Sequence, residues 1–147
     1  MALIYRSFLP TDYDAAYALW SETEGIGLSE ADSRGNIERF LRHNPGMSFV
    51  AVEGGAGGAL AGVVLCGSDG RRGYLHHLAV APVCRRRGVG RGLIDRCLAA
   101  LAAAGMRKCH IFVIADNIEG KLFWQRMEWE ERTSLLIMSK DVRPPAP

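Results

Sequence analysis

A turn rich in glycine and arginine constrains the fold of this chain more than any other stretch. It reads Arg85-Arg86-Arg87-Gly88-Val89-Gly90-Arg91-Gly92. The apolar segment Tyr74–Val80 before it is typical of a strand, and the residues after it are apolar at positions 89, 93, 94, 97, 98 and 101, the spacing of one helical face. The sequence therefore predicts that a strand passes into a helix N-terminus at this turn.

Such a turn is suited to bind phosphate. The first turn of a helix has backbone N–H groups without intrahelical partners, and the helix dipole adds partial positive charge there. Glycine lets the backbone approach an anion closely, and arginine adds charge-assisted hydrogen bonds. We therefore expect an anion-binding site at this turn.

Other interpretations of the turn are less well supported. A dinucleotide-binding loop needs G-x-G-x-x-G in the first strand–helix unit, whereas these glycines stand at 88, 90 and 92, late in the chain. A Walker loop needs Gly-Lys-Ser/Thr, which is absent. An arginine cluster for nucleic acid has no aromatic stripe beside it, and the net charge of +2 suggests no bulk affinity for nucleic acid. A solvated charged turn that caps a helix is the structural alternative.

The rest of the chain predicts an α+β fold with a mixed sheet. Strands are expected at 3–8, 48–53, 60–66, 74–80, 108–115 and 133–140, and helices at 11–20, around 37–41, from 89 to near Gly105, and at 117–127. Gly-rich turns at 54–58 and 68–73 would join three strands into a meander. The 147 residues suggest one domain, 1–141, followed by a Pro-rich tail, 142–147.

Composition narrows the cellular context. No apolar run is long enough to span a bilayer and the N-terminus has no signal-peptide layout, so a cytoplasmic protein is expected. The four cysteines form no C-x-x-C pair, and three of them fall in apolar periodic segments. We expect reduced cysteines that serve as small apolar residues, and no metal site.

The loop Arg85-x-x-Gly88-x-Gly90, the segment 77–82 and the segment 117–129 together resemble the GNAT superfamily of N-acetyltransferases. Arg85-x-x-Gly88-x-Gly90 is similar to the family's Q/R-x-x-G-x-G/A loop. The segment 77–82 resembles the strand that leads into that loop, and 117–129 resembles the family's N-x-x-A-x-x-F-Y-x-x-x-G-F helix. The resemblance implies a mixed, mostly antiparallel sheet of six or seven strands, flanked by about four helices and splayed between the fourth and fifth strands.

The resemblance also implies a reaction. The family transfers an acetyl group from acetyl-CoA to a primary amine, by direct attack in a ternary complex. Loop amides from Arg86 to Arg91 would hold the pyrophosphate, Leu78 and Val80 would offer backbone groups to pantetheine, and Asn117 would touch pantetheine or a water, although it fits an N-cap equally well. The implied cofactor-binding set is Leu78, Ala79, Val80, Arg85, Arg86, Arg87, Gly88, Val89, Gly90, Arg91, Asn117, Phe123 and Trp124.

Amide formation needs a neutral amine and therefore a proton acceptor. Strand alternation predicts Tyr74, His76, Leu78 and Val80 on one face and His77 on the other. Our hypothesis is that His76 accepts the proton, through water or directly, with Tyr74 assisting; the alternative is a histidine bonded in the core. His77 is expected to be structural.

Two departures from the family pattern weaken the transfer of roles. Trp124 stands where the family has a tyrosine acid, and an indole N–H has no useful acidity. Met127 replaces the family's glycine, which suggests a differently shaped helix end. A non-catalytic acyl-CoA-binding sensor is therefore the main competing function, and a nucleic-acid binder is third.

The sequence says less about which amine accepts the acetyl group. In the family the first two helices and their loop bind it, and here that region contains Trp20, Glu22, Glu24, Glu30 and Asp32. These carboxylates could favour a cationic amine or could be a solvated surface. A small-molecule amine, a protein N-terminus and a lysine all remain open, as does a homodimer.

Overall fold

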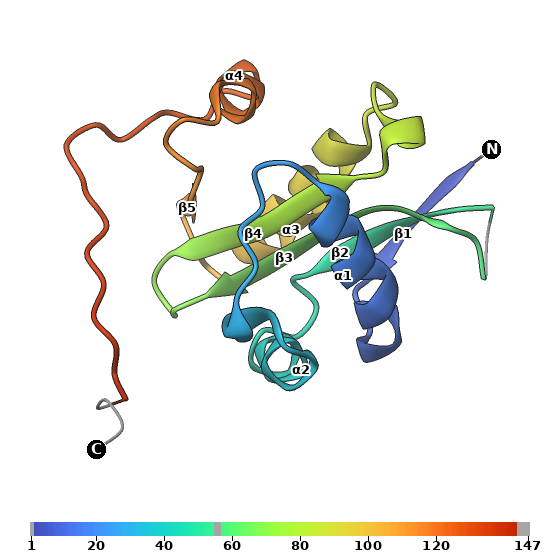
Figure 1. Cartoon of the computed structure of the whole chain (residues 1–147), viewed down its shortest axis with the longest axis horizontal. Coiled ribbons are helices and arrows are strands. Elements are labelled where there is room, and N and C mark those ends of the chain that lie inside the picture. Colours follow the sequence, from blue (N-terminus) through green and yellow to red (C-terminus); the bar gives the residue numbers. More distant parts are fainter. Residues whose placement is uncertain (1, 55–56, 144–147) are drawn as a thin grey trace.

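One sheet contains the five strands of the described residues, in chain order (Figure 1). The computed structural model describes residues 2–54 and 57–143, so parts of the expected 54–58 turn and of the 142–147 tail lie outside it. The strands are β1 (Leu3–Ser7), β2 (Phe49–Glu53), β3 (Leu60–Ser68), β4 (Gly73–Val80) and β5 (Cys109–Ile111). Neighbours from β1 to β4 are antiparallel and β5 is parallel to β4. The expected meander and mixed sheet are confirmed.

Helices cover both faces of the sheet (Figure 1). On one face lie α1 (Tyr13–Glu22) and α2 (Arg34–His43), on the other lies α3 (Val89–Ala103), and α4 (Ile118–Arg126) follows β5. Short 3-10 turns at Pro10–Asp12, Glu30–Asp32 and Pro82–Cys84 precede α1, α2 and α3. The first of these turns explains why α1 begins two residues later than predicted.

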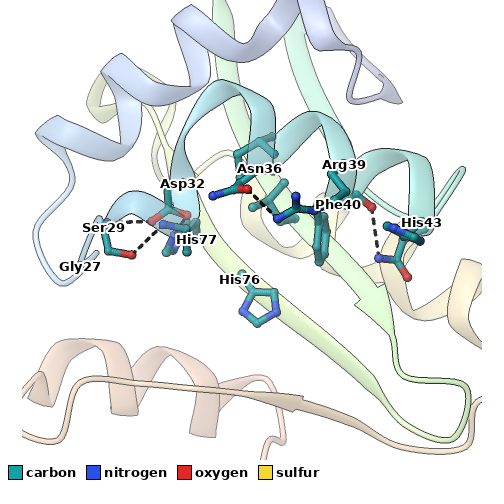
Figure 2. Close-up of a pocket in the computed structure, with 13 residues that line it drawn as sticks. Gly27, Ser29, Asp32, Asn36, Arg39, Phe40, His43, His76 and His77 are labelled. Atoms are coloured by element: carbon teal, nitrogen blue, oxygen red, sulfur yellow. Dashed lines mark hydrogen bonds and ion pairs between the residues drawn. The ribbon is translucent and has the colours of Figure 1, made fainter. Parts of the chain in front are cut away.

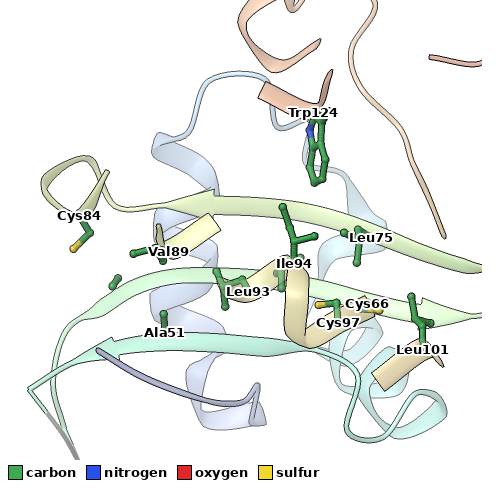
Figure 3. Close-up of a cluster of buried hydrophobic side chains, with 12 residues drawn as sticks. Ala51, Cys66, Leu75, Cys84, Val89, Leu93, Ile94, Cys97, Leu101 and Trp124 are labelled. Atoms are coloured by element: carbon green, nitrogen blue, oxygen red, sulfur yellow. The ribbon is translucent and has the colours of Figure 1, made fainter. Parts of the chain in front are cut away.

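Two apolar cores result from the alternation of strand residues. The core under α3 combines Leu93, Ile94, Cys97 and Leu101 of that helix with Ala51, Val64, Cys66 and Leu75 of the sheet (Figure 3). The core under α1 and α2 combines Ala16, Leu19, Trp20 and Ile37 with Val50, Val52, Val63 and Leu65. Cys66, Cys84 and Cys97 are buried as free thiols, as the sequence predicted.

The C-terminal end of α3 is closed as expected by Gly105. This residue has φ 92°. Its N–H donates to Ala102 O at 3.0 Å, and the N–H of Met106 donates to Leu101 O at 2.9 Å. This is the Schellman pair of bonds, which needs a left-handed residue after the helix.

The C-terminal part of the sheet differs from the expectation of six or seven strands. The strand predicted at 108–115 is only Cys109–Ile111, and the strand predicted at 133–140 does not form. After α4 the chain runs away from β5 and lies extended and exposed, so it has no neighbouring strand to supply hydrogen bonds (Figure 1). The prediction of a last strand in this sheet was wrong for that reason.

The predicted faces of β4 are also wrong, because the strand bulges. Val63 pairs with Ala79 and Leu65 with His76, so His77 and Leu78 together face one residue of β3. His77 has φ 53°, a left-handed conformation. Such an extra residue reverses the alternation. His76 and His77 therefore lie on the same face of the sheet, towards α2 (Figure 2), whereas Leu78 and Val80 pack on the core under α3.

The expected splay between β4 and β5 is present. Pairing of the two strands ends at Leu75 and Ile111, although β4 continues to Val80. No strand of the described residues covers the outer edge of β4 beyond Leu75. None of the helices in the described residues is long and apolar enough to cross a membrane.

The close approach of α3 to β1 generates a stability prediction. A Cβ added at Gly92 would lie 2.5 Å from the Tyr5 hydroxyl oxygen and 2.6 Å from its ring. The Arg96 guanidinium sits 3.9 Å over that ring and hinders its retreat. We expect Gly92→Ala to lower the free energy of unfolding by about 1–3 kcal/mol in urea titrations, because overpacking strains the contact.

Gly35→Ala is the matched control. Gly35 also lies in a helix, and an added Cβ would meet nothing within 4 Å. This substitution should be neutral or stabilising by up to about 1 kcal/mol. If both substitutions changed the free energy of unfolding equally, the close contact between Gly92 of α3 and Tyr5 of β1 would not be the cause.

Candidate functional site

The loop before α3 presents backbone amides to its surroundings. Arg86 and Gly88 have φ of 65° and 76°, and Gly88 is the N-cap of α3. The first helical bond is donated by Gly92 N–H to Gly88 O at 2.9 Å, so helix geometry gives the N–H groups of residues 89–91 no acceptor one turn earlier. A Cβ at Gly88 would meet nothing within 4 Å. The space beside Gly88, at the N-terminus of α3, is therefore open.

Glu53, at the end of β2, anchors this loop. Its carboxylate accepts a hydrogen bond from the Cys84 thiol and another from Arg87 Nη1, both at 3.1 Å. These two bonds hold the pKa of the Glu53 carboxyl below its usual value, and burial raises the pKa of the Cys84 thiol. The side chain of Arg87 is thus directed at Glu53, although Arg87 is exposed like Arg85, Arg86 and Arg91.

The loop meets β4 and α4 at Gly90. A Cβ on this glycine would lie 3.3 Å from Phe123 Cζ and 3.8 Å from Val80 Cγ2. The structure therefore brings together three residues of the predicted cofactor set that are far apart in sequence.

The backbone of β4 faces the splay at the predicted positions. The N–H of Ala81 donates to Ala61 O of the β3 side at 2.8 Å. Because backbone groups alternate along a strand, those of Val80 and Leu78 point to the opposite, uncovered edge. An extended ligand lying in the splay could pair with that edge as a strand does.

Two other members of the predicted set belong to α4. The side chain of Asn117 accepts a hydrogen bond from Gly120 N–H at 3.0 Å, which confirms its N-cap role. Trp124 is 8% exposed and packs edge-on against Phe123 and Trp129, with ring centroids 5.2 and 4.8 Å away. Trp124 thus belongs to the core under α3.

His76 and Tyr74 lie in a row of rings at the start of the splay. Their rings are stacked, with centroids 6.5 Å apart, and the His76 ring also meets Phe40 of α2 edge-on at 5.9 Å. Phe112, just after β5, lies 6.3 Å from both rings. Burial lowers the pKa of His76, the neighbouring charge of His77 lowers it further, and Asp32 opposes the shift.

His77 forms a partly buried pair with Asp32, which the sequence did not predict. His77 Nε2 lies 2.8 Å from Asp32 Oδ1, and Asp32 is 7% exposed. Ser29 N–H donates to the other carboxylate oxygen at 3.1 Å, and Trp20 Nε1 donates to the His77 carbonyl at 2.8 Å. The pair spans 45 positions and depends on the bulge, so local sequence patterns could not show it.

A cavity of about 520 Å³ lies between α2 and β4 (Figure 2). Its polar lining comes from both elements and from the loop between α1 and α2: Ser29, Asp32, Asn36, Arg39, His43, Asn44, His76 and His77. Of the carboxylates expected around the acceptor, only Asp32 lines it. Glu22, Glu24 and Glu30 are exposed and do not line it.

The loop before α3, the uncovered strand edge and the polar cavity follow one another along β4. In the described residues no group of three or more His, Cys, Asp or Glu side chains is arranged to hold a metal ion.

Comparison with known proteins agrees with this geometry. An acetyltransferase of Sodalis glossinidius is 31% identical over 92% of this chain and 92% of its own length. An acetyltransferase of Pectobacterium atrosepticum is 34% identical over 85% of this chain and 86% of its own length. The structure of AAC(6')-Iy in complex with the bisubstrate analogue CoA-S-monomethyl-acetylneamine superposes with a TM-score of 0.73, at 20% identity, over 96% of this chain and 99% of that one.

The match to a known family extends from the start of α1 to Trp129. It covers residues 13–129, which contain the loop, the splay and the cavity together. The chain therefore belongs to the Acetyltransferase (GNAT) family.

Proposed function

We propose that this acetyltransferase transfers the acetyl group of acetyl-CoA to a primary amine held in the cavity between α2 and β4. The observation that carries the proposal is the continuity of the open loop, the uncovered edge of β4 and the cavity with His76 and His77. A bisubstrate analogue bound to AAC(6')-Iy, which has the same fold, supports direct transfer between two substrates bound together.

The chain has residues suited to bind each part of the cofactor. The loop amides of residues 86–91 and the exposed arginines would take the pyrophosphate, because they combine backbone donors, charge and the helix dipole. Val80 and Leu78 would pair with the pantetheine arm along the splay, and Phe123 would pack beside it. Glu53 contributes indirectly, since it holds Arg87 and Cys84 and so fixes the loop.

His76 would accept the proton of the acceptor amine, directly or through water. It takes this proton from the ammonium form of the acceptor before attack. Attack by the neutral amine on the thioester carbonyl then forms the amide bond and breaks the carbon–sulfur bond, and the nitrogen loses a second proton, which can pass to the thiolate or to solvent. A lowered pKa keeps the imidazole of His76 neutral and able to accept that proton at neutral pH. Tyr74, stacked on His76, would assist the transfer.

His77 would position the site rather than take the proton. Its Nε2 is already bonded to Asp32, and its carbonyl is held by Trp20. These contacts fix the left-handed backbone of the bulge, and the bulge directs His76 and His77 to the cavity. A buried and bonded pair of this kind stabilises one backbone geometry.

The departing thiolate would take its proton from a group other than Trp124. The indole is buried in the core and its N–H is not acidic enough to serve. Water, Tyr74 and the ammonium formed on attack are the remaining sources.

Release of free thiol from acetyl-CoA, measured with a panel of small amines, N-terminal peptides and lysine peptides, tests the proposed reaction. Amine-dependent thiol release is expected with at least one class. Calorimetric binding of acetyl-CoA with no release on the whole panel would favour the competing function, a non-catalytic acyl-CoA-binding sensor. Binding of DNA or RNA with steep salt dependence, and none of CoA, would contradict both.

The anion-binding role of the loop predicts the effect of Gly88→Val. A β-branched residue is strained at the φ of 76° found here, so the loop amides should shift and CoA should bind about tenfold more weakly by calorimetry. Gly70→Val is the matched control, because Gly70 also has a positive φ, 94°, and an added Cβ there meets nothing within 4 Å. Both variants should be less stable, but only the first should lose CoA affinity; equal affinities would exclude the loop as the pyrophosphate site.

The proposed proton acceptor predicts a change in pH dependence. In the parent enzyme kcat/KM should fall as the pH drops through the lowered pKa of His76, that is below about 6.5, because protonated imidazole cannot accept a proton. His76→Ala should lower kcat/KM by about 10²–10⁴-fold and flatten this acidic limb. His43→Ala, a substitution in the lining of the same cavity, should keep the acidic limb of the pH profile. An unchanged limb in His76→Ala would rule out this histidine as the base.

A further inference from the structure

Arg39 of α2 lines the cavity between α2 and β4 and forms no ion pair within the part of the chain that the structure describes. Its neighbours one turn away on the helix are Gly35, Asn36, Arg42 and His43, none of which carries a negative charge. The guanidinium is therefore available to a negatively charged group that enters the cavity.

Asn36 holds this guanidinium in place. Asn36 Nδ2 donates to the Glu30 carbonyl at 2.8 Å, and Asn36 Oδ1 accepts a hydrogen bond from Arg39 Nη2 at 2.6 Å. Of the described residues, only Asn36 accepts a hydrogen bond from the Arg39 side chain. Because a guanidinium has five N–H donors in a planar fork, this bond orients the group and leaves donors for a carboxylate or a phosphate.

Asp32 is the one carboxylate among the described residues that line the cavity, and its oxygens already have partners. Oδ1 lies 2.8 Å from His77 Nε2, Oδ2 accepts from Ser29 N–H at 3.1 Å, and the residue is 7% exposed. A second ammonium group on the acceptor would find no open carboxylate in this lining and would be repelled by Arg39. The lining thus favours an amine whose other charged group is negative.

The two ends of such a molecule fit opposite sides of the cavity. His76 lies on β4 and Arg39 lies across the cavity on α2 (Figure 2). The lining also contains the apolar side chains of Ile37, Phe40 and Leu65, which are suited to contact a carbon chain that joins an amine to an anionic group. The volume of about 520 Å³ is typical of sites for small molecules.

We infer that the acceptor is a small primary amine that also carries a carboxylate or a phosphate, and that Arg39 binds this anionic group while the amine lies at His76. The inference rests on the proposed function, because it assigns the acceptor class of that reaction. Carboxylate and phosphate share the chemistry that matters here, a pair of oxygens that matches the guanidinium fork. The products are the N-acetylated acid and CoA.

Acetylation of matched amines tests the sign of the charge. ω-Amino carboxylates of increasing chain length are compared with their neutral amides, and aminoalkyl phosphates with the corresponding amino alcohols, by kcat/KM with acetyl-CoA. At least one anionic amine should exceed its neutral partner about tenfold or more, and the larger ratio identifies the anion. Equal values within every pair, or a preference for diamines, would overturn the inference and leave acetyl transfer itself intact.

Arg39→Gln tests the residue. It should lower kcat/KM for the preferred anionic amine about 10–100-fold and bring the ratio to its neutral partner towards one, because the charge-assisted bonds are lost. Arg39→Lys should keep part of the preference, since it keeps the charge without the fork. Arg42→Gln, at an exposed residue of the same helix outside the cavity lining, should keep the full ratio. An equal loss for both amines in Arg39→Gln, or the same change of ratio in Arg42→Gln, would overturn the inference.

Direct binding separates this inference from the reaction. The CoA-bound chain is titrated by calorimetry with an ω-amino carboxylate and with its amide. The acid should bind more tightly, and Arg39→Gln should remove the difference. Tighter binding of the acid without acetylation would contradict the proposed function and support the role of Arg39. Equal binding of acid and amide would overturn that role, whatever the activity.

Discussion

The bulge in β4 is the constraint on which the site depends. It inserts His77 in a left-handed conformation opposite a single residue of β3, just after the pairing of β4 with β5 ends. The bulge brings two neighbouring histidines to one face and turns the backbone edge of the following residues towards the splay. The partly buried bond between His77 and Asp32 and the bond from Trp20 hold this backbone in place. A regular strand would place His77 in the opposite core.

The two cores support this arrangement from both sides. The helix α3 packs so closely on the sheet that Gly92 and Gly62 leave no room for a side chain against Tyr5 and against Val89 and Leu93. That contact fixes the N-terminus of α3, and with it the open loop, relative to β4. Glu53 adds a polar anchor from β2. The loop proposed to bind the pyrophosphate is thus rigidly connected to the strand along which the rest of the ligand would lie.

Much of this organisation could be predicted from the sequence. The hydrophobic spacing after Gly88 gave the helix and its N-terminus, and the glycine-rich turns gave the meander, because these signals are local. The bulge, the pair between His77 and Asp32 and the cavity could not be predicted, since each depends on contacts between residues distant in sequence. The last strand was predicted from the composition of residues 133–140, but composition does not specify the neighbour that a strand needs.

The central claim is that a diphosphate binds the amides at the start of α3 while the rest of the ligand follows the uncovered edge of β4. Backbone amide NMR shifts during titration with CoA test this claim most directly. We expect the largest shifts at residues 86–91, with further shifts at Leu78 and Val80. Absence of shifts at millimolar CoA, or shifts confined to other parts of the chain, would contradict it.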